Sequence, residues 1–254
     1  MRILLTNDDG IRAPGLRALA QALEPLGELL ILAPEREQSC AGHAITLHKP
    51  LRMVPARVEG VSAAAFAVSG TPADCVVLAR DNEPAPPDVV VSGINAGANM
   101  GEEVFYSGTV AAAMEACLQG LRSIAVSVTA YHDCDYRAAA AFVKALIPRY
   151  IETDLPSGMF LNVNVPNLPP EGIKGVHATR LGRRAYANVV QRREDPRGRP
   201  YYWLSGEVTE VDSGTDTDIG TCRGDMISVT PVCFDMTDHP TIETVAGLLT
   251  GMPS

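Results

Sequence analysis

The sequence lacks the features by which membrane proteins and nucleic-acid-binding proteins are most easily recognised. It has no run of the roughly 18 apolar residues that a membrane-spanning helix needs. Its densest basic stretch, residues 180–199, is interrupted by Glu194 and Asp195, and the net charge of the chain is −9. The stretch therefore predicts a solvated face or hairpin, and we expect the protein to bind neither membranes nor nucleic acid.

Paired cysteines are also missing. The six cysteines are scattered and form no C-x-x-C motif, which argues against a zinc ribbon or a disulfide framework and indicates free thiols in a reducing compartment. The apolar run near the N-terminus, residues 3–5, is far shorter than the apolar segment of a secretory signal. We therefore expect a cytoplasmic protein.

Several common nucleotide and hydrolase motifs do not occur. There is no G-x-x-x-x-G-K-S/T motif, no G-x-G-x-x-G motif after the first predicted strand and no G-x-S-x-G motif. A P-loop NTPase, a dinucleotide-binding domain and a serine-hydrolase elbow are therefore disfavoured. A haloacid-dehalogenase-type phosphatase would separate its aspartates by one residue, whereas Asp8 and Asp9 are adjacent. That class of phosphatase is kept only as an alternative.

Apolar segments of two kinds alternate along the first two-thirds of the chain. Short apolar or alternating runs predict strands at residues 2–6, 28–34, 66–70, 87–93, 123–129 and 159–166. Helical spacing is found at residues 14–27, 71–80, 108–120 and 135–150. Thr71, Pro72 and Asp74 form a helix-start signature. This alternation predicts an α/β protein whose open sheet is covered by helices.

The last third of the chain has a different pattern. From about Gly175 it is turn-rich and strand-like, and residues 182–222 predict an extended hairpin arm with little core of its own. Residues 225–232 predict a terminal strand, and residues 240–251 predict a short helix. The segment DSGTDTD resembles a calcium loop only in composition, and we interpret it as a solvated turn.

Polar residues follow three of the predicted strands. Asp8 and Asp9 come after the first strand, Ser39 after the second, and Asn95 after the strand at 87–93. Ligands of open α/β sheets bind beyond the carboxyl ends of the strands, so these loops are expected to meet. An all-oxygen set with two carboxylates suits a hard divalent cation such as Mg²⁺ or Mn²⁺. Taken singly, each of these residues could equally be an ordinary turn or loop residue.

The helix predicted to begin near Ser107 offers a second, anionic site. Small residues at Ser107, Gly108 and Thr109 let backbone N–H groups approach an anion, which the helix dipole also favours. Simple N-capping by Ser107 or Thr109 is the alternative. A cation site and an anion site at one sheet edge together suggest a phosphate held against a metal. His43 and His48 are interpreted as loop-packing residues, with His43 a minor candidate for substrate contact or proton transfer.

Five blocks of the sequence resemble one known family. ILLTNDDG, APEREQSCAGHAIT, SGTPADCV, VSGINAGANMGEEVFYSGTVAAAMEA and TDTDIGTCRGDMISVTPV occur in this order across nearly the whole chain. They are similar to the SurE family of stationary-phase survival proteins, which act as metal-dependent nucleotidases. The resemblance is weakest between Arg183 and Arg199.

The resemblance implies a role for each candidate residue and an activity. The implied metal ligands are Asp8, Asp9, Ser39 and Asn95, the first two also being the catalytic pair, and the implied substrate or phosphate contacts are Asn7, Gly93, Asn95, Ser107, Gly108 and Thr109. The implied activity is hydrolysis of nucleoside 5′- and 3′-monophosphates, with short polyphosphate as a further substrate and Mg²⁺ or Mn²⁺ as cofactor. A non-catalytic nucleotide-binding module and a purely structural oligomer are the alternatives.

The same resemblance implies a fold and an assembly. The expected fold is a three-layer Rossmann-like α/β sandwich with a C-terminal β-hairpin arm and a terminal helix, forming one domain over residues 1–254. Residues 1–178 would form the core, and residues 179–254 the arm, closing strand and helix. The family exchanges this C-terminal part between subunits, so we expect a homo-oligomer, either a dimer or a tetramer.

Overall fold

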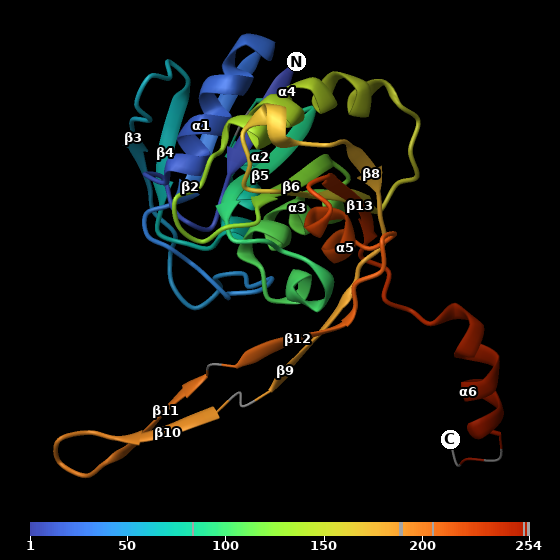
Figure 1. Cartoon of the computed structure of the whole chain (residues 1–254). Helices are drawn as coiled ribbons and strands as arrows, with labels where there is room; N and C mark the ends of the chain where they lie inside the picture. The colour runs from blue at the N-terminus through green and yellow to red at the C-terminus, as the bar shows by residue number, and fades with distance from the viewer. Residues whose placement is uncertain (83, 188–189, 205, 251, 253–254) are drawn as a thin grey trace.

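The central element of the fold is a mixed β-sheet. The computed structural model describes residues 1–82, 84–187, 190–204, 206–250 and 252 (Figure 1). In sheet order the strands are β3 (Met53–Ala56), β4 (Ala64–Val68), β2 (Glu28–Pro34), β1 (Arg2–Thr6), β5 (Val89–Ala96), β6 (Arg122–Val128), β7 (Met159–Val165), β13 (Ile227–Cys233) and β8 (Val176–Ala178). Strands β4, β2, β1, β5, β6 and β7 are parallel to their neighbours in this run, and β3 and β13 join it antiparallel.

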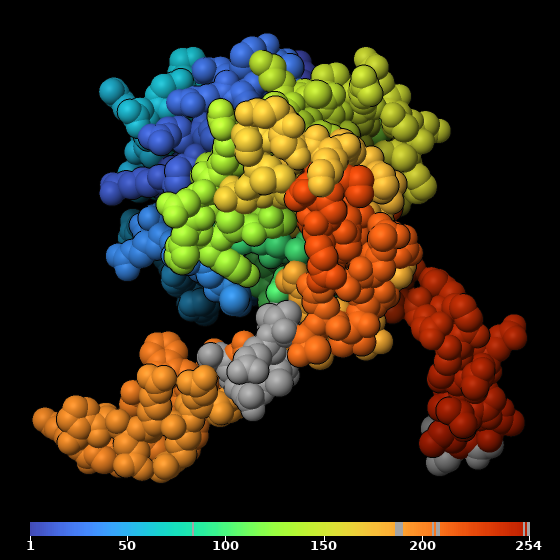
Figure 2. All heavy atoms as spheres, viewed as in Figure 1, coloured from blue at the N-terminus to red at the C-terminus, as the bar shows by residue number. Residues whose placement is uncertain are grey.

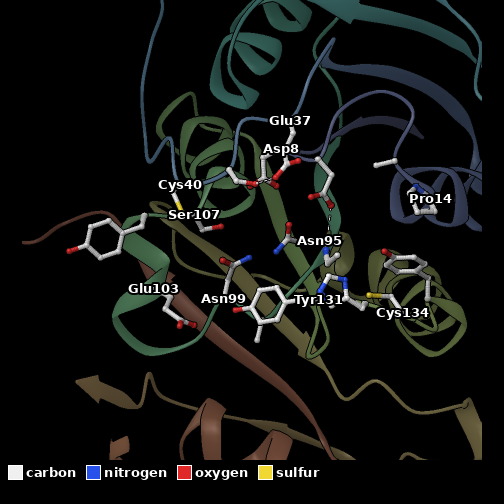
Figure 3. A pocket seen from close by; sticks show the side chains of 18 of the residues that line it. Asp8, Pro14, Glu37, Cys40, Asn95, Asn99, Glu103, Ser107, Tyr131 and Cys134 are labelled. Atoms are coloured by element: carbon white, nitrogen blue, oxygen red, sulfur yellow. Dashed lines mark hydrogen bonds between the residues drawn. The ribbon is translucent and has the colours of Figure 1, made fainter. Parts of the chain in front are cut away.

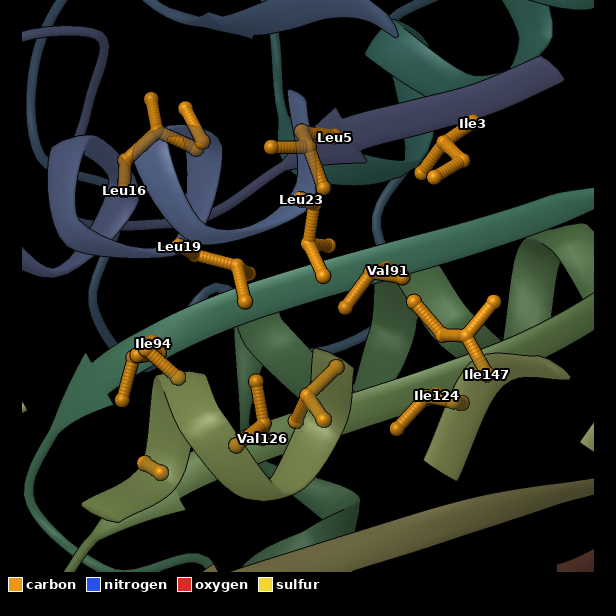
Figure 4. Packing of buried hydrophobic residues seen from close by; sticks show 14 of the residues in the cluster. Ile3, Leu5, Leu16, Leu19, Leu23, Val91, Ile94, Ile124, Val126 and Ile147 are labelled. Atoms are coloured by element: carbon orange, nitrogen blue, oxygen red, sulfur yellow. The ribbon is translucent and has the colours of Figure 1, made fainter. Parts of the chain in front are cut away.

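Helices cover both faces of this sheet. Helices α1 (Pro14–Leu23) and α4 (Arg137–Glu152) pack on one face, and α2 (Pro72–Asn82) and α3 (Gly108–Leu118) pack on the other. Side chains of β1 alternate between the two layers, with Ile3 and Leu5 in the α1–α4 cluster (Figure 4) and Leu4 in the α2–α3 cluster. Strands buried on both faces read as continuous apolar runs. The predicted three-layer α/β sandwich is confirmed.

Two helix starts follow the signals in the sequence. Pro14 occupies the first turn of α1, where its missing N–H costs no hydrogen bond. At α2 the Thr71 hydroxyl accepts from the Asp74 N–H at 3.1 Å, and the Asp74 carboxylate accepts from the Thr71 N–H at 2.8 Å. This reciprocal pair is a capping box, as the sequence predicts. The edge strand β3 was not predicted.

The order of the strands creates a switch point between β1 and β5. From β1 the chain adds β2 and then β4 on one side, and afterwards β5, β6 and β7 on the other side. Strands β1 and β5 pair parallel, from Ile3 with Val89 to Thr6 with Ser92. The loops after β1 and β5 start at the same edge of the sheet but lead to helices on opposite faces. A crevice in which ligands can bind therefore opens between these two loops.

The C-terminal third contains an arm and a returning segment. Strands β9 (Arg183–Ala187) and β12 (Glu207–Asp212) pair antiparallel, as do β10 (Val190–Glu194) and β11 (Pro200–Leu204), and together they extend away from the globular body (Figures 1 and 2). The predicted arm boundary at residue 222 is wrong. Helix α5 (Asp218–Arg223) returns to the body and buries Ile219 and Cys222, because its apolar face packs against Met100.

The last described helix lies outside the globular body (Figure 1). The remaining short elements are η1 (Glu24–Leu26), η2 (Gly101–Phe105), η3 (Pro170–Gly172), η4 (His239–Thr241) and α6 (Ile242–Leu248). Strand β13 pairs within this chain with β7 and β8, so exchange between subunits stays a prediction for the arm and α6. Residues 188, 189 and 205 of the predicted arm and Gly251 of the predicted terminal helix lie outside the described residues. Within the described part of the chain, no helix combines the length and the apolar character needed to cross a membrane.

The arm and α6 expose apolar surface that a second copy of the chain would cover. Tyr202, Trp203 and Leu204 on β11 are 59%, 57% and 78% exposed. A two-stranded ribbon is marginal in water by itself. We therefore predict that light scattering at micromolar concentration gives a multiple of the 27.0 kDa chain mass.

A paired variant makes this prediction specific. Replacing Tyr202 and Trp203 together by Ser should lower the measured mass, whereas Leu47→Ser should not, although Leu47 is 90% exposed on the body. A wild-type protein that scatters as a 27.0 kDa monomer would contradict the prediction.

Candidate active site

A large cavity lies at the switch point of the sheet. It has a volume of about 1130 Å³ and is lined by residues at or beyond the carboxyl ends of β1, β2, β5 and β6 (Figure 3). Asp8, Asp9, Ser39, Asn95 and Ser107 all line it. Five of the residues predicted from the sequence are thus brought together from segments far apart in the chain, with Asn95 lying at the end of β5 itself and not in the loop expected after it.

A tight turn presents the two aspartates. The Asn7 amide donates to the Gly10 carbonyl at 3.0 Å, and the Asn7 side-chain oxygen accepts from the Gly10 N–H at 3.2 Å. Gly10 has φ 98°, a left-handed conformation that favours glycine. Asn7 is fully buried and does not line the cavity. Its side chain therefore shapes the turn, and the predicted substrate contact by Asn7 has no counterpart in the cavity wall.

Helix α3 holds Asp8 in place. The Thr109 hydroxyl donates to Asp8 Oδ1, and both side chains are buried. A Cβ atom added to Gly108 would lie 2.7 Å from Asp8 Cβ, which is too close. Gly108 therefore allows Asp8 to pack against the first turn of α3, and Thr109 fixes one of its carboxylate oxygens. Neither Gly108 nor Thr109 lines the cavity.

The protein environment disfavours the ionised form of both aspartates and raises their pKa values. Burial raises the pKa of Asp8, more than the hydrogen bonds from Thr109 lower it, and the charge of Glu37 raises it further. Burial and then the charge of Asp8 raise the pKa of Asp9 to about 6. Desolvation and like charge both disfavour an ionised carboxylate. A cation beside the pair would therefore favour the ionised form of both carboxyl groups.

Ser39 and Asn95 add neutral oxygens on the same cavity. The Ser39 hydroxyl donates to Glu37 Oε1 at 2.5 Å, and the Asn95 amide donates to the Gly97 carbonyl at 2.7 Å. These bonds occupy the hydroxyl hydrogen of Ser39 and an amide hydrogen of Asn95. The side-chain oxygens of both residues keep lone pairs that can bind a cation. Both residues line the cavity with the aspartates.

The remaining predicted contacts have structural roles. Ser107 caps α3, accepting from the Val110 N–H at 3.1 Å, and it also lines the cavity. Gly93 has φ 133°, and a Cβ atom there would lie 2.3 Å from the Val126 carbonyl oxygen on the neighbouring strand. Gly93 is thus required by the packing of β5 on β6 and does not line the cavity. His43 Nε2 lies 2.7 Å from Glu115 Oε2 on α3, as a loop-packing role predicts.

Sequence reasoning missed one wall of the cavity. The loop from β6 to α4 contributes five lining residues, namely Tyr131, His132, Asp133, Cys134 and Tyr136. Glu37, Asn99, Glu103 and Tyr106 also line the cavity. The rule that sites lie beyond the carboxyl ends of strands applies to β6 as well, so its loop could have been included.

The charge of the lining residues bears on what the cavity can hold. Among the described residues that line it, the carboxylates are Asp8, Asp9, Glu37, Glu103 and Asp133, and there is no Lys or Arg. Among all described residues of the chain, no three or more His, Cys, Asp or Glu side chains lie close enough together to hold a metal ion by themselves. The candidate set instead combines two carboxylates with hydroxyl and amide oxygens, which fits a hard cation. An anionic ligand would meet net negative charge unless such a cation accompanied it.

Fold and site together define a class: a doubly wound α/β protein with an acidic oxygen-donor site at its switch point. The family model described as "Survival protein SurE" matches residues 3–188. The chain therefore belongs to the SurE family, and the resemblance seen in the sequence is confirmed.

Individual relatives agree with this assignment. A protein of Heliobacterium modesticaldum named "5'-nucleotidase SurE" is 49% identical over 252 residues, covering 99% of this chain and 93% of the relative. One of Moorella thermoacetica with the same name is 50% identical over 250 residues, covering 98% and 96%. The crystal structure of the SurE protein from Aquifex aeolicus superposes with a TM-score of 0.85 at 37% identity, covering 98% of this chain and 99% of that one.

The contact between Thr109 and Asp8 predicts a specific loss of metal affinity. Thr109→Val keeps the shape of the side chain and removes the hydroxyl that fixes Asp8. Partners that orient a metal ligand are typically worth about 10- to 100-fold in affinity. We expect Mn²⁺ binding, measured by calorimetry, to weaken about tenfold in Thr109→Val and to be largely kept in Thr109→Ser. Equal affinity in both variants would exclude this role.

The raised pKa of Asp9 predicts a pH-dependent stability in metal-free buffer. Because its pKa is raised to about 6 in the folded protein, folding favours the protonated form, and the ionised form destabilises the protein at higher pH. Asp9→Asn should therefore raise the melting temperature in EDTA at pH 7. A gain of about 1 kcal/mol corresponds to about 2–4 °C for a chain of this size.

The pH series and a control complete this test. The advantage of Asp9→Asn should shrink as the pH falls from 7 through 6 towards 4, since wild-type Asp9 then becomes protonated. Asp154→Asn, on an exposed part of the surface, should show no such trend. If Asp9→Asn melts below wild type in EDTA at pH 7, the main role of Asp9 is to form the turn.

Proposed function

We propose that this chain is a metal-dependent 5′-nucleotidase, which hydrolyses nucleoside 5′-monophosphates to nucleoside and phosphate. The observation that carries the proposal is a cavity at the switch point that combines paired aspartates with neutral oxygens and lacks Lys and Arg among its described lining residues. Relatives named "5'-nucleotidase SurE" match nearly all of the chain at about half identity, which supports the same activity here.

A divalent cation fits the donor set. Asp8, Asp9, Ser39 and Asn95 would hold Mg²⁺ or Mn²⁺ in this cavity. Such an ion, when bound, would neutralise phosphate charge, polarise the phosphoryl group and lower the pKa of a water molecule. The raised pKa values of both aspartates support this assignment, because a cation would relieve the burial and like-charge costs that raise them.

The residues of the chain would then orient the reaction. Asp8 is held by Thr109 and stays fixed, while Asp9 is more accessible and is the better placed of the two to orient the attacking water. Attack of that water forms a new P–O bond as the bond from phosphorus to the ribose oxygen breaks on the opposite side. Ser107, which lines the cavity at the N-terminus of α3, would face the phosphoryl oxygens, where the helix dipole stabilises negative charge, while Gly108 and Thr109 support Asp8 from behind.

The proposal extends to related substrates and to assembly. Nucleoside 3′-monophosphates and short polyphosphate present the same terminal phosphoryl group and are proposed as further substrates. The exposed arm and α6 support a homodimer or homotetramer in which C-terminal segments exchange. Six free cysteines among the described residues support a reducing, cytoplasmic setting.

A substrate panel tests the activity. We predict phosphate release from AMP with Mn²⁺ or Mg²⁺ and its loss in EDTA, with 3′-AMP and tripolyphosphate measured alongside. Asp8→Asn and Asp9→Asn should each lower kcat/KM about 100-fold or more, the loss expected when an electrostatic contact to the transition state is removed.

The panel also separates the alternatives. A non-catalytic nucleotide-binding module would bind AMP without releasing phosphate. A haloacid-dehalogenase-type enzyme would form an aspartyl-phosphate, detectable by mass spectrometry of acid-quenched protein. Metal-independent release of phosphate, or full activity in Asp8→Asn, would overturn the proposed mechanism.

A further inference from the structure

The root of the arm is bonded to one wall of the cavity. The Arg184 N–H donates to Glu102 Oε2 at 2.8 Å, and Arg184 Nη1 donates to Glu103 Oε2 at 2.8 Å. Arg184 belongs to β9, the first strand of the arm, whereas Glu102 and Glu103 belong to η2. Glu103 lines the cavity. A segment that extends away from the body is therefore anchored on the candidate site.

The ion pair between Arg184 and Glu103 differs from the other pairs of the arm. Its side chains are only 14% and 19% exposed, whereas those of Arg192 and Glu194 farther along the arm are 57% and 53% exposed. Exposed ion pairs contribute little, but removing one partner of a largely buried pair leaves a charge without compensation. The Arg184–Glu103 pair is thus expected to hold its geometry.

A buried carboxylate reinforces the same junction. Asp218 of α5 accepts from the Gly101 N–H at 2.9 Å and from the Gly182 N–H at 2.8 Å. Gly101 opens η2 and Gly182 directly precedes β9, so one side chain ties the wall of the cavity to the root of the arm. A Cβ atom on Gly101 would lie 2.9 Å from the Gly182 carbonyl oxygen, which shows how closely the two segments pass.

The position of Glu103 indicates which part of a substrate it would meet. Glu103 lies on the far side of Ser107 and Asn99 from Asp8 (Figure 3). The cavity of about 1130 Å³ is far larger than a phosphate group needs. With phosphate at the Asp8 end, the remaining space falls to the nucleoside. A carboxylate there can accept hydrogen bonds from ribose hydroxyls.

We propose that Glu103 contacts the nucleoside part of the substrate and that Arg184, at the root of the arm, is the positioning residue that holds Glu103 there. This inference rests on the proposed nucleotidase function. It makes the arm part of the substrate site through Arg184, in addition to any role in assembly. In this inference, Glu103 on η2 helps to select a nucleoside, whereas the phosphate is bound and cleaved at the end of the cavity that contains Asp8.

Comparison of two substrates tests the inference. KM and kcat are measured with Mn²⁺ for AMP and for p-nitrophenyl phosphate, which has no ribose. We expect Glu103→Gln and Arg184→Gln each to raise KM for AMP about 10- to 100-fold, as loss of a hydrogen bond to a charged group predicts. The kcat for AMP and both constants for p-nitrophenyl phosphate should stay within about twofold.

Two further variants test whether Arg184 acts through Glu103 and whether the effect is specific to this ion pair. The double variant Glu103→Gln with Arg184→Gln should have the same KM for AMP as Glu103→Gln alone, because Arg184 acts through Glu103. Arg192→Gln, which breaks an exposed pair of the same arm, should behave as wild type. If Arg184→Gln does not fold, as judged by circular dichroism, Arg184→Lys replaces it, since it keeps the charge but loses the planar fork.

The outcomes distinguish this inference from the proposed function. A wild-type protein that hydrolyses neither substrate overturns the proposed function and the inference with it. An active wild type with an unchanged KM for AMP in Glu103→Gln overturns the inference alone. Equal losses on AMP and p-nitrophenyl phosphate also overturn it, because they would show a general structural effect instead of a contact to the nucleoside.

Discussion

The repulsion between two adjacent carboxylates at the end of a buried strand is the constraint on which the rest of the site depends. Asp8 and Asp9 follow β1 directly, and Asp8 is only 5% exposed. Burial of like charges without compensation is costly, yet the cavity wall adds further carboxylates. The fold therefore holds a local electrostatic cost that a divalent cation would relieve. Binding of a cation, and with it binding of an anionic substrate, would both follow from the same arrangement.

The topology of the sheet explains why such a site forms at this position. Because β2 and β5 lie on opposite sides of β1, the strand order reverses between β1 and β5, and the loops after β1 and β5 diverge and leave space between them. The turn closed by Asn7 and Gly10 then directs the aspartates into that space. Helix α3 follows β5 and supplies Thr109 and Gly108 behind Asp8. The site is thus assembled by strand order, and the single residues refine it.

The sequence predicted local features and the meeting of strand ends, but not the individual contacts between distant side chains. The capping box at Thr71 and Asp74 was predictable because its partners lie within one turn of helix. The meeting of Asp8, Ser39 and Asn95 was predictable because parallel strands end at one edge. The contact from Thr109 to Asp8 was not, since a small hydroxyl at a helix start serves equally as a cap, an anion contact or a support for another side chain.

The C-terminal third shows the same limit. The segment around Asp218 has the composition of a solvated turn, and nothing local reveals that this carboxylate is buried. Besides the adjacent Ile219 N–H, its burial is stabilised by the backbone N–H groups of Gly101 and Gly182, which only the completed fold brings to it. A polar side chain is assigned to the surface by default unless its partners are known. Asp218 was therefore misread for a physical reason.

These buried contacts also decide how the arm relates to the body. A ribbon joined to the body only by its chain ends could move without effect on the cavity. Here Asp218 and the Arg184–Glu103 pair fasten the first residues of the arm to η2, and η2 leads directly into Ser107 and α3. Segments that share buried polar contacts move together, because separating them would strand charges and N–H groups. The first residues of the arm and the wall of the cavity are therefore joined by buried polar contacts, so that displacing one would break contacts of the other.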